Sequence, residues 1–170
     1  VREILTSPKE ERIIDFGQVI AGRVRIKIDV PKGTQITITH TEGLDAEGNF
    51  FDNNPTADQR IEYISDGIAR TYEPHFTFQG FRYAMVDGIE ELKAEDIVAV
   101  VLSSEKEDVG TFACSNDDIN RLYENTRWSQ RANMLSIPTD CPQREKAGWT
   151  GDIQVYAKTA LLNEDVTPFL

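Results

Sequence analysis

Thr34-Gln35-Ile36-Thr37-Ile38-Thr39-His40 alternates polar and apolar side chains. Successive side chains of a β-strand point to opposite faces, so this alternation is typical of a strand with one face buried and the other in solvent. Pro31-Lys32-Gly33 precedes it as a turn signal, and Arg23 to Val30 forms another strand-like run. The stretch from Arg23 to Thr41 therefore predicts a β-hairpin.

The same strand-like pattern extends over the first two thirds of the chain, where short β-branched runs recur between Gly, Pro, Asn and Asp residues. The predicted strands are Arg12 to Phe16, Arg23 to Val30, Thr34 to Thr41, Gln59 to Ser65, Arg70 to Phe78, Phe81 to Asp87 and Ile97 to Ser103. Glu42 to Asp58 contains too many breakers for an element and predicts a long surface loop. About eight strands at this spacing favour an antiparallel β-sandwich.

The pattern changes to helical spacing after Phe112. A capping-box-like start at Ser115 to Asp118 opens a predicted helix over Asn116 to Met134. After a loop, a second helix opens at Asp152, and Thr167-Pro168 is typical of the start of a third. The side chains expected to face inward from the second helix are Ile153, Tyr156, Ala160 and, as further candidates, Val155, Thr159 and Leu162.

The change from a strand-like to a helical pattern predicts two domains. Residues 1–108 form the β-sandwich, and residues 109–170 form the N-terminal part of a helical domain, which we expect to be truncated because the chain stops as its third helix begins.

Composition excludes several classes of partner. The chain has 18 Lys and Arg against 29 Asp and Glu, a net charge of -11, and no basic stripe for a phosphate backbone, so we expect no nucleic acid partner. The longest mainly apolar stretch, Ile97 to Leu102, is far short of the roughly 20 residues that cross a bilayer, so we expect a soluble protein with no membrane partner. Cys114 and Cys141 lack metal-like spacing, which predicts two free thiols, no metal site and no cofactor.

The segment between the two predicted helices contains several side chains that can bind a ligand or take part in catalysis. Three carboxylates, a guanidinium and an indole lie in it, on Asp140, Glu145, Asp152, Arg144 and Trp149. Carboxylates and Arg grip sugar hydroxyls, an aromatic face stacks on a sugar ring, and a carboxylic acid protonates a glycosidic oxygen. Helix capping and surface ion pairs would explain any one of these carboxylates, and Asp152 fits both roles, but the whole pattern favours a carbohydrate site.

Pro138-Thr139-Asp140-Cys141-Pro142-Gln143-Arg144-Glu145, followed by Gly148-Trp149-Thr150-Gly151-Asp152, resembles the signature of bacterial α-L-rhamnosidases. Ile14-Asp15-Phe16-Gly17-Gln18 and Phe78-Gln79-Gly80-Phe81-Arg82-Tyr83 are similar to the sandwich before the catalytic domain in that family. The resemblance implies a piece of a longer enzyme, in which a mainly β chain ends in the first two to three helices of an (α/α)6 barrel. It also implies that the enzyme removes terminal α-L-rhamnose from rhamnose-containing glycosides, with inversion.

The resemblance assigns the residue roles. It makes Glu145, four residues before Trp149, the general acid, with Asp140, Arg144, Trp149 and Asp152 contacting rhamnose. It places the general base on a glutamate beyond Leu170, so the partner it implies is the rest of the catalytic domain, and this chain alone is expected to be inactive. Many family members have one more residue, and a second acidic one, between the Arg and the Gly-Trp pair, whereas only Glu145-Lys146-Ala147 intervene here.

A general acid must stay protonated near neutral pH, which requires apolar contact or nearby negative charge to raise its pKa. Trp149 is a candidate for the first, and Asp140 and Asp152 for the second. Arg144 and Lys146 oppose protonation if their charges point inward, and the sequence leaves their direction open.

The alternative is a stand-alone β-sandwich module that binds carbohydrate or a partner protein without catalysis. An aromatic stripe could be its platform, although core packing explains the stripe better: Phe76, Phe78, Phe81 and Tyr83. Trp128 is expected to pack in a core or between domains, and His40 and His75 to be structural or solvent-exposed. The loop motif favours the hydrolase.

Overall fold

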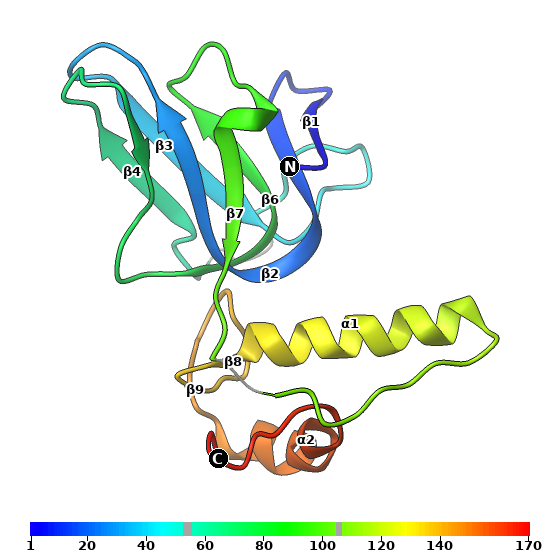
Figure 1. Cartoon of the computed structure of the whole chain (residues 1–170). Helices are drawn as coiled ribbons and strands as arrows, with labels where there is room; N and C mark the ends of the chain where they lie inside the picture. Colours follow the sequence, from blue (N-terminus) through cyan, green and yellow to red (C-terminus); the bar gives the residue numbers. More distant parts are fainter. Residues whose placement is uncertain (53–55, 105–106) are drawn as a thin grey trace.

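The computed structural model describes residues 1–52, 56–104 and 107–170. A strand-rich part comes first along the chain and a helical part follows it, with the two in contact where α1 lies under the strands (Figure 1). The strands of the first part are β1 (Glu3–Thr6), β2 (Arg12–Ile28), β3 (Gln35–Thr41), β4 (Arg60–Ile64), β5 (Arg70–Tyr72), β6 (Gln79–Asp87) and β7 (Ile97–Val101). The second part contains α1 (Asp117–Asn133), the short strands β8 (Met134–Leu135) and β9 (Ile137–Pro138), and α2 (Thr150–Asn163).

The long strand β2 belongs to two layers. Its first half pairs antiparallel with β1 and β6, and its second half pairs antiparallel with β7 and β5. The register against β6 shifts between Asp15 and Ile20, where Gly17 has a φ of 80°. A bulge of this kind bends a strand and increases its twist, which lets β2 leave one layer and enter the other.

Both layers contribute to one core. Side chains of β3 and β6 pack in the same buried cluster as those of β7, although neither β3 nor β6 pairs with β7. The buried members of this cluster are Ile14, Ile20, Val24, Ile26, Ile28, Ile36, Ile38, Phe81, Ala84, Val86, Ile89 and Ile97. The predicted antiparallel β-sandwich followed by helices is therefore confirmed.

The predicted hairpin between Arg23–Val30 and Thr34–Thr41 is wrong. At the end of β2, Ile26 pairs with Tyr72 on one edge and with Ile97 on the other. Both edges of the strand are occupied, so β3 has no place beside it and pairs instead with β6 and β4. The alternation in β3 was correctly interpreted as a half-buried strand, but it carries no information about which strand is its neighbour.

The predicted strand from Arg70 to Phe78 is also too long, because β5 ends at Tyr72. Pro74 has no N–H for a sheet, and Phe76 has a φ of 58°, which a strand does not accommodate. The aromatic stripe does not form: Phe76 is fully exposed and Phe81 fully buried. The sequence patterns did not indicate β1, a four-residue edge strand.

The two histidines lie in different surroundings. His40 is buried, stacks edge-on against Phe81 at 4.7 Å, and donates from Nδ1 to the Gln59 carbonyl at 2.8 Å. His75 is exposed.

The first helix forms where it was predicted, but with a different cap. Oδ1 of Asn116, rather than Ser115, accepts hydrogen bonds from the N–H groups of Asp118 and Ile119. Trp128 of this helix packs against the sandwich core, which confirms its predicted packing role.

The second helix begins at Thr150, two residues before the predicted start. Ala160 is buried and Ile153 and Tyr156 pack beside it, as expected, within a small cluster that includes Met134. Val155 and Leu162 do not face inward, being 85% and 67% exposed, and Thr159 is exposed as well.

The predicted third helix is a single turn closed by the Phe169 and Leu170 N–H groups on the Val166 carbonyl. None of the described helices is long and apolar enough to cross a membrane.

Candidate functional site

The loop that joins β9 to α2 is closed by its own backbone. The Asp140 N–H donates to the Ala147 carbonyl at 3.0 Å, and the Ala147 N–H donates to Oδ1 of Asp140 at the same distance. The Trp149 N–H then donates to the Ala147 carbonyl at 3.0 Å and leads into α2. The intervening residues, Cys141 to Lys146, are therefore held as a compact loop rather than an extended linker.

Asp140 sits at the base of this loop. Burial alone raises the pKa of its carboxyl, but hydrogen bonds from the Cys141 thiol and from backbone N–H groups outweigh burial, so the pKa lies below its ordinary value. The thiol donates to Oδ2 at 3.0 Å. Asp140 is thus an ionised acceptor near neutral pH, suited to gripping a hydroxyl group rather than to giving up a proton.

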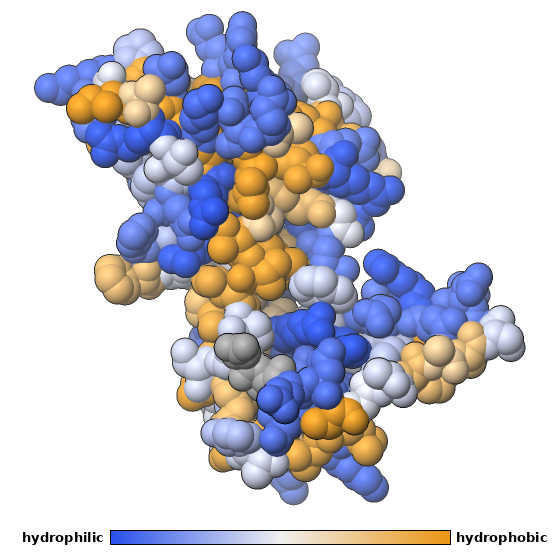
Figure 2. Space-filling view, in the orientation of Figure 1, coloured by the Kyte–Doolittle hydropathy of each residue, from blue (hydrophilic) through white to orange (hydrophobic). Residues whose placement is uncertain are grey.

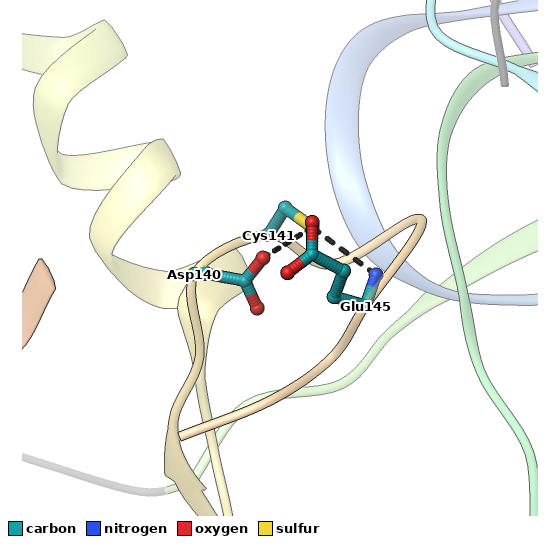
Figure 3. Close-up of side chains that lie close together, drawn as sticks. All are labelled: Asp140, Cys141 and Glu145. Atoms are coloured by element: carbon teal, nitrogen blue, oxygen red, sulfur yellow. Dashed lines mark hydrogen bonds between the residues drawn. The ribbon is translucent and has the colours of Figure 1, made fainter. Parts of the chain in front are cut away.

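Glu145 lies near the tip of the loop, with its side chain 42% exposed. Nη2 of Arg144 contacts Oε1 at 2.8 Å, and the indole Nε1 of Trp149 donates to Oε2 at 2.8 Å. Its backbone N–H points at the Cys141 sulfur, 3.4 Å away, so that Asp140, Cys141 and Glu145 form one cluster (Figure 3). Arg144 and Trp149 thus occupy both carboxyl oxygens of Glu145, so contact between this group and a substrate requires Arg144 to move aside or a substrate to displace it.

The two cations of the loop point in different directions. Arg144 faces Glu145, whereas Lys146 turns toward the sandwich, where Nζ donates to the Phe78 carbonyl at 2.5 Å. The sequence left both directions open, and of the two cations only Arg144 contacts Glu145 directly.

A cavity of about 540 Å³ lies between α1 and α2, beside the loop. Asp140 and Asp152 line it together with Tyr156, Gln130 and Met134 among others. Asp152 is exposed in the first turn of α2, where a carboxylate is favoured by the helix dipole. Of the five predicted site residues, two line this cavity, whereas Arg144, Glu145 and Trp149 gather around the loop tip.

The Asp140, Cys141 and Glu145 cluster brings one oxygen or sulfur atom of each residue within 4.8 Å of the others. Such spacing is compatible with metal ligation, but each atom has a protein partner: the Cys141 thiol donates to Asp140, and Glu145 is held by Arg144 and Trp149. The cluster is accounted for as a hydrogen-bonded arrangement of the loop. Both cysteines are free thiols, as predicted.

Sequence reasoning missed the contacts that fix the loop from outside. Gln143 donates to Glu42 at 3.1 Å, and Lys146 and the backbone near Pro142 lie against β6. One signal was present, because Gly80 interrupts a strand, and a glycine within a strand often marks a close backbone approach. No feature of the sequence indicated the contacts that Cys141 makes.

Comparison with known proteins covers both parts of the chain. Residues 5–103 match the family model described as the bacterial alpha-L-rhamnosidase concanavalin-like domain. Residues 107–170 match the model described as the bacterial alpha-L-rhamnosidase 6 hairpin glycosidase domain.

Curated relatives that align with nearly the whole chain are named alpha-L-rhamnosidases. An alpha-L-rhamnosidase of Alteromonas sp. (strain LOR) is 38% identical over 168 residues, which are 95% of this chain and 18% of that protein. One from Formosa agariphila is 35% identical over 167 residues, 94% of this chain and 18% of that protein. This chain therefore spans less than a fifth of the curated relatives it matches.

Solved structures agree with the fold. The native alpha-L-rhamnosidase of Aspergillus terreus superposes with a TM-score of 0.92 at 39% identity, over 98% of this chain and 20% of that one. The Streptomyces avermitilis alpha-L-rhamnosidase complexed with L-rhamnose superposes with a TM-score of 0.93 at 34% identity, over 99% of this chain and 17% of that one. Since the concanavalin-like model alone matches more than half of the residues, this chain belongs to the bacterial α-L-rhamnosidase family.

Proposed function

We propose that this chain works as part of a longer α-L-rhamnosidase that removes terminal α-L-rhamnose from rhamnose-containing glycosides, with Glu145 as the general acid. The observation that carries the proposal is the placement of Glu145, a reachable carboxyl group on a backbone-closed loop, between Arg144 and Trp149. A proton donor for a glycosidic oxygen has to be accessible to the substrate and fixed in direction, and this residue meets both conditions.

The neighbouring residues divide the binding of the sugar. Asp140 and Asp152 offer carboxylate oxygens to hydroxyl groups from the cavity between α1 and α2. Arg144 can exchange its contact with Glu145 for a contact with the substrate, which would leave Glu145 free to hold a proton. Trp149, 58% exposed, presents an aromatic face for the C–H face of the ring.

We propose an inverting reaction whose general base lies outside this chain. Inverting glycosidases separate their two carboxyl groups by about 6.5–9.5 Å, to leave room for a water. The oxygens of Asp140 and Glu145 approach within 4.8 Å, which is too close for such a pair. Asp140 also accepts a hydrogen bond at each oxygen, from the Ala147 N–H and from the Cys141 thiol, and these donors favour an acceptor of hydroxyl groups over a base that takes up a proton.

The division into a sandwich (1–108) and the start of a catalytic domain (109–170) is part of the same proposal. Apolar surface gathers over α2 and the C-terminal segment in Figure 2. The exposed apolar side chains there include Val155, Leu161, Leu162 and Leu170. This is the surface that the rest of the catalytic domain would cover.

The test is an assay of the full-length protein that contains this chain, with an aryl α-L-rhamnoside and a rhamnose-containing disaccharide. Turnover is expected on both, and proton NMR of the first product should show β-L-rhamnose, the inverted anomer. Binding of rhamnosides with no turnover would favour the non-catalytic module instead, and initial release of the α-anomer would refute inversion.

A further inference from the structure

The sandwich touches the Glu145 loop through the backbone of β6. A Cβ atom added at Gly80 would lie 2.8 Å from the Gln143 nitrogen and 2.9 Å from the Pro142 carbonyl carbon. Separations under 3 Å are not tolerated between a Cβ and backbone atoms, so only glycine lets the loop approach this closely. The loop therefore packs directly on the strand at a position just before Arg144 and Glu145.

A second contact holds the loop just after Glu145. The Lys146 ammonium donates to the Phe78 carbonyl at 2.5 Å and to Oε1 of Gln79 at 3.4 Å, and it lies 4.6 Å from the centre of the Phe78 ring. Lys146 has a φ of 53°, in the left-handed region that non-glycine residues rarely adopt. Such a conformation persists in a non-glycine residue only where the surroundings impose it.

Glu145 is thus bracketed by anchors near the N-terminal end of β6. Gly80 receives the loop on the N-terminal side of Glu145, where Gln143 also donates to the half-buried Glu42 at 3.1 Å. Lys146 fastens the loop on the C-terminal side, and the hydrogen bonds between Asp140 and Ala147 close its base. The base of the loop is closed by its own hydrogen bonds, whereas residues on either side of Glu145 contact the sandwich.

We propose that Lys146 and Gly80 are positioning residues for Glu145, and that residues 78–80 of the sandwich are a structural part of the catalytic machinery. This inference rests on the proposed role of Glu145. Lys146 serves in two ways: its side chain fixes the loop tip, and its positive charge is kept against the sandwich instead of beside the proton donor. Loss of either anchor lets Glu145 move from the line of the glycosidic oxygen.

A displacement of Glu145 should impair proton donation more than substrate binding. A displacement of about 1 Å at a reacting group costs on the order of 100-fold in rate. A disaccharide, whose leaving group is poor, depends on the proton, whereas an aryl rhamnoside with an acidic phenol depends on it less. We therefore expect Lys146→Met in the full-length protein to lower kcat on the disaccharide by about 10- to 100-fold, to lower kcat on the aryl substrate much less, and to leave KM nearly unchanged.

Matched variants make the result specific. Lys146→Arg keeps a cation and donors and should recover most of the rate, whereas Lys93→Met, at an exposed position of the sandwich, should behave as the parent. Gly80→Ala should reproduce the Lys146→Met effect, with Gly43→Ala as its control because a Cβ at Gly43 meets nothing within 4 Å. If Gly80→Ala fails to fold, Lys146→Met alone decides the question.

A second measurement separates this inference from the proposed function. Timed trypsin digestion reports on the loop itself, since the bond after Arg144 lies between the two anchors. Faster cleavage there in Lys146→Met and Gly80→Ala than in their controls supports the anchors, even if the parent has no rhamnosidase activity. An active parent in which Lys146→Met loses rate equally on both substrates, or loses none, would overturn the inference, as would unchanged cleavage after Arg144.

Discussion

The indole N–H of Trp149 donates a 2.8 Å hydrogen bond to the carboxylate of Glu145. The two residues are four positions apart at the entrance to α2, and both are exposed to solvent. Trp149 therefore directs the carboxyl group through a polar contact while its ring faces remain available to a sugar. It does not form the apolar wall that the sequence suggested.

This double role of Trp149 leads to a first prediction. Trp149→Phe removes the N–H but keeps an aromatic face, whereas Trp149→Ala removes both. If the ring stacks on the sugar, Trp149→Ala should raise KM about tenfold in the full-length protein, the equivalent of roughly 1.4 kcal/mol, and Trp149→Phe should raise it far less. Steady-state kinetics with an aryl rhamnoside measure both, and equal KM values for the two variants would rule out stacking.

Asp15 and Arg82 give a prediction about stability. The guanidinium donates to both oxygens of Asp15 at 2.8 Å, and this hydrogen bonding is the main reason why the pKa of the buried carboxyl is lowered. Arg82→Met leaves that charge buried without its partner, which should cost on the order of 3 kcal/mol of unfolding free energy. Urea unfolding of the chain at pH 7 measures the loss.

Arg60 provides the control, because its ion pair with Glu62 is about half exposed on both sides. Arg60→Met should change the unfolding free energy by less than about 1 kcal/mol. Similar losses for the two variants would mean that burial of Asp15 adds nothing.

His40 gives a prediction about pH. Burial lowers its pKa to about 4, with a contribution from the charge of Lys146, although the hydrogen bond to the Gln59 carbonyl acts in the opposite direction. The unfolded chain takes up this proton near pH 6.5, whereas the folded chain resists it until about pH 4. The free energy of unfolding should therefore fall as the pH drops from about 6.5 to about 4, by on the order of 3 kcal/mol, and this contribution should then level off.

His40→Gln has no titrating ring, so the parent and this variant should differ most at pH 7 and progressively less toward pH 4. The exposed His75 serves as the control, because His75→Gln should leave the slope of the parent curve in place. Unfolding curves of parent and His40→Gln that stay parallel from pH 7 to pH 4 would contradict the prediction.

The sequence predicted much of the fold, and the failures of that prediction have physical causes. Alternation over Thr34 to Thr41 identifies a half-buried strand, but the neighbours of β2 are chosen by long-range pairing, which local patterns do not encode. The helical spacing of apolar residues predicted the positions of α1 and α2 in the chain closely. It could not distinguish the buried side of α2 from the side that carries Val155, because apolar residues lie on both.

The candidate site residues could be proposed from the sequence because they lie close together in the chain, between Asp140 and Asp152. The direction of Lys146 was not, since it depends on a contact with Phe78, 68 positions away. The same holds for Gly80, whose meaning becomes visible only when Gln143 is seen packed on it.

A further prediction concerns the chain by itself. Assayed alone with an aryl α-L-rhamnoside, the 170-residue chain should show no turnover, because its Asp140 and Glu145 approach within 4.8 Å and no inverting pair is formed between them. The full-length protein is the positive control. Turnover by the chain alone that disappears in Glu145→Gln would place the second catalytic group within these residues.

The central claim is that Glu145 gives a proton to the glycosidic oxygen, and Glu145→Gln in the full-length protein tests it most directly. The change keeps the shape of the side chain and removes the proton, and Glu47→Gln, on the exposed loop of the sandwich, is the matched control. The account predicts that kcat on a rhamnose disaccharide falls by about 10²–10⁴-fold, with a clearly smaller fall on an aryl rhamnoside that has a good leaving group. An equal fall on both substrates, or none on either, would contradict it.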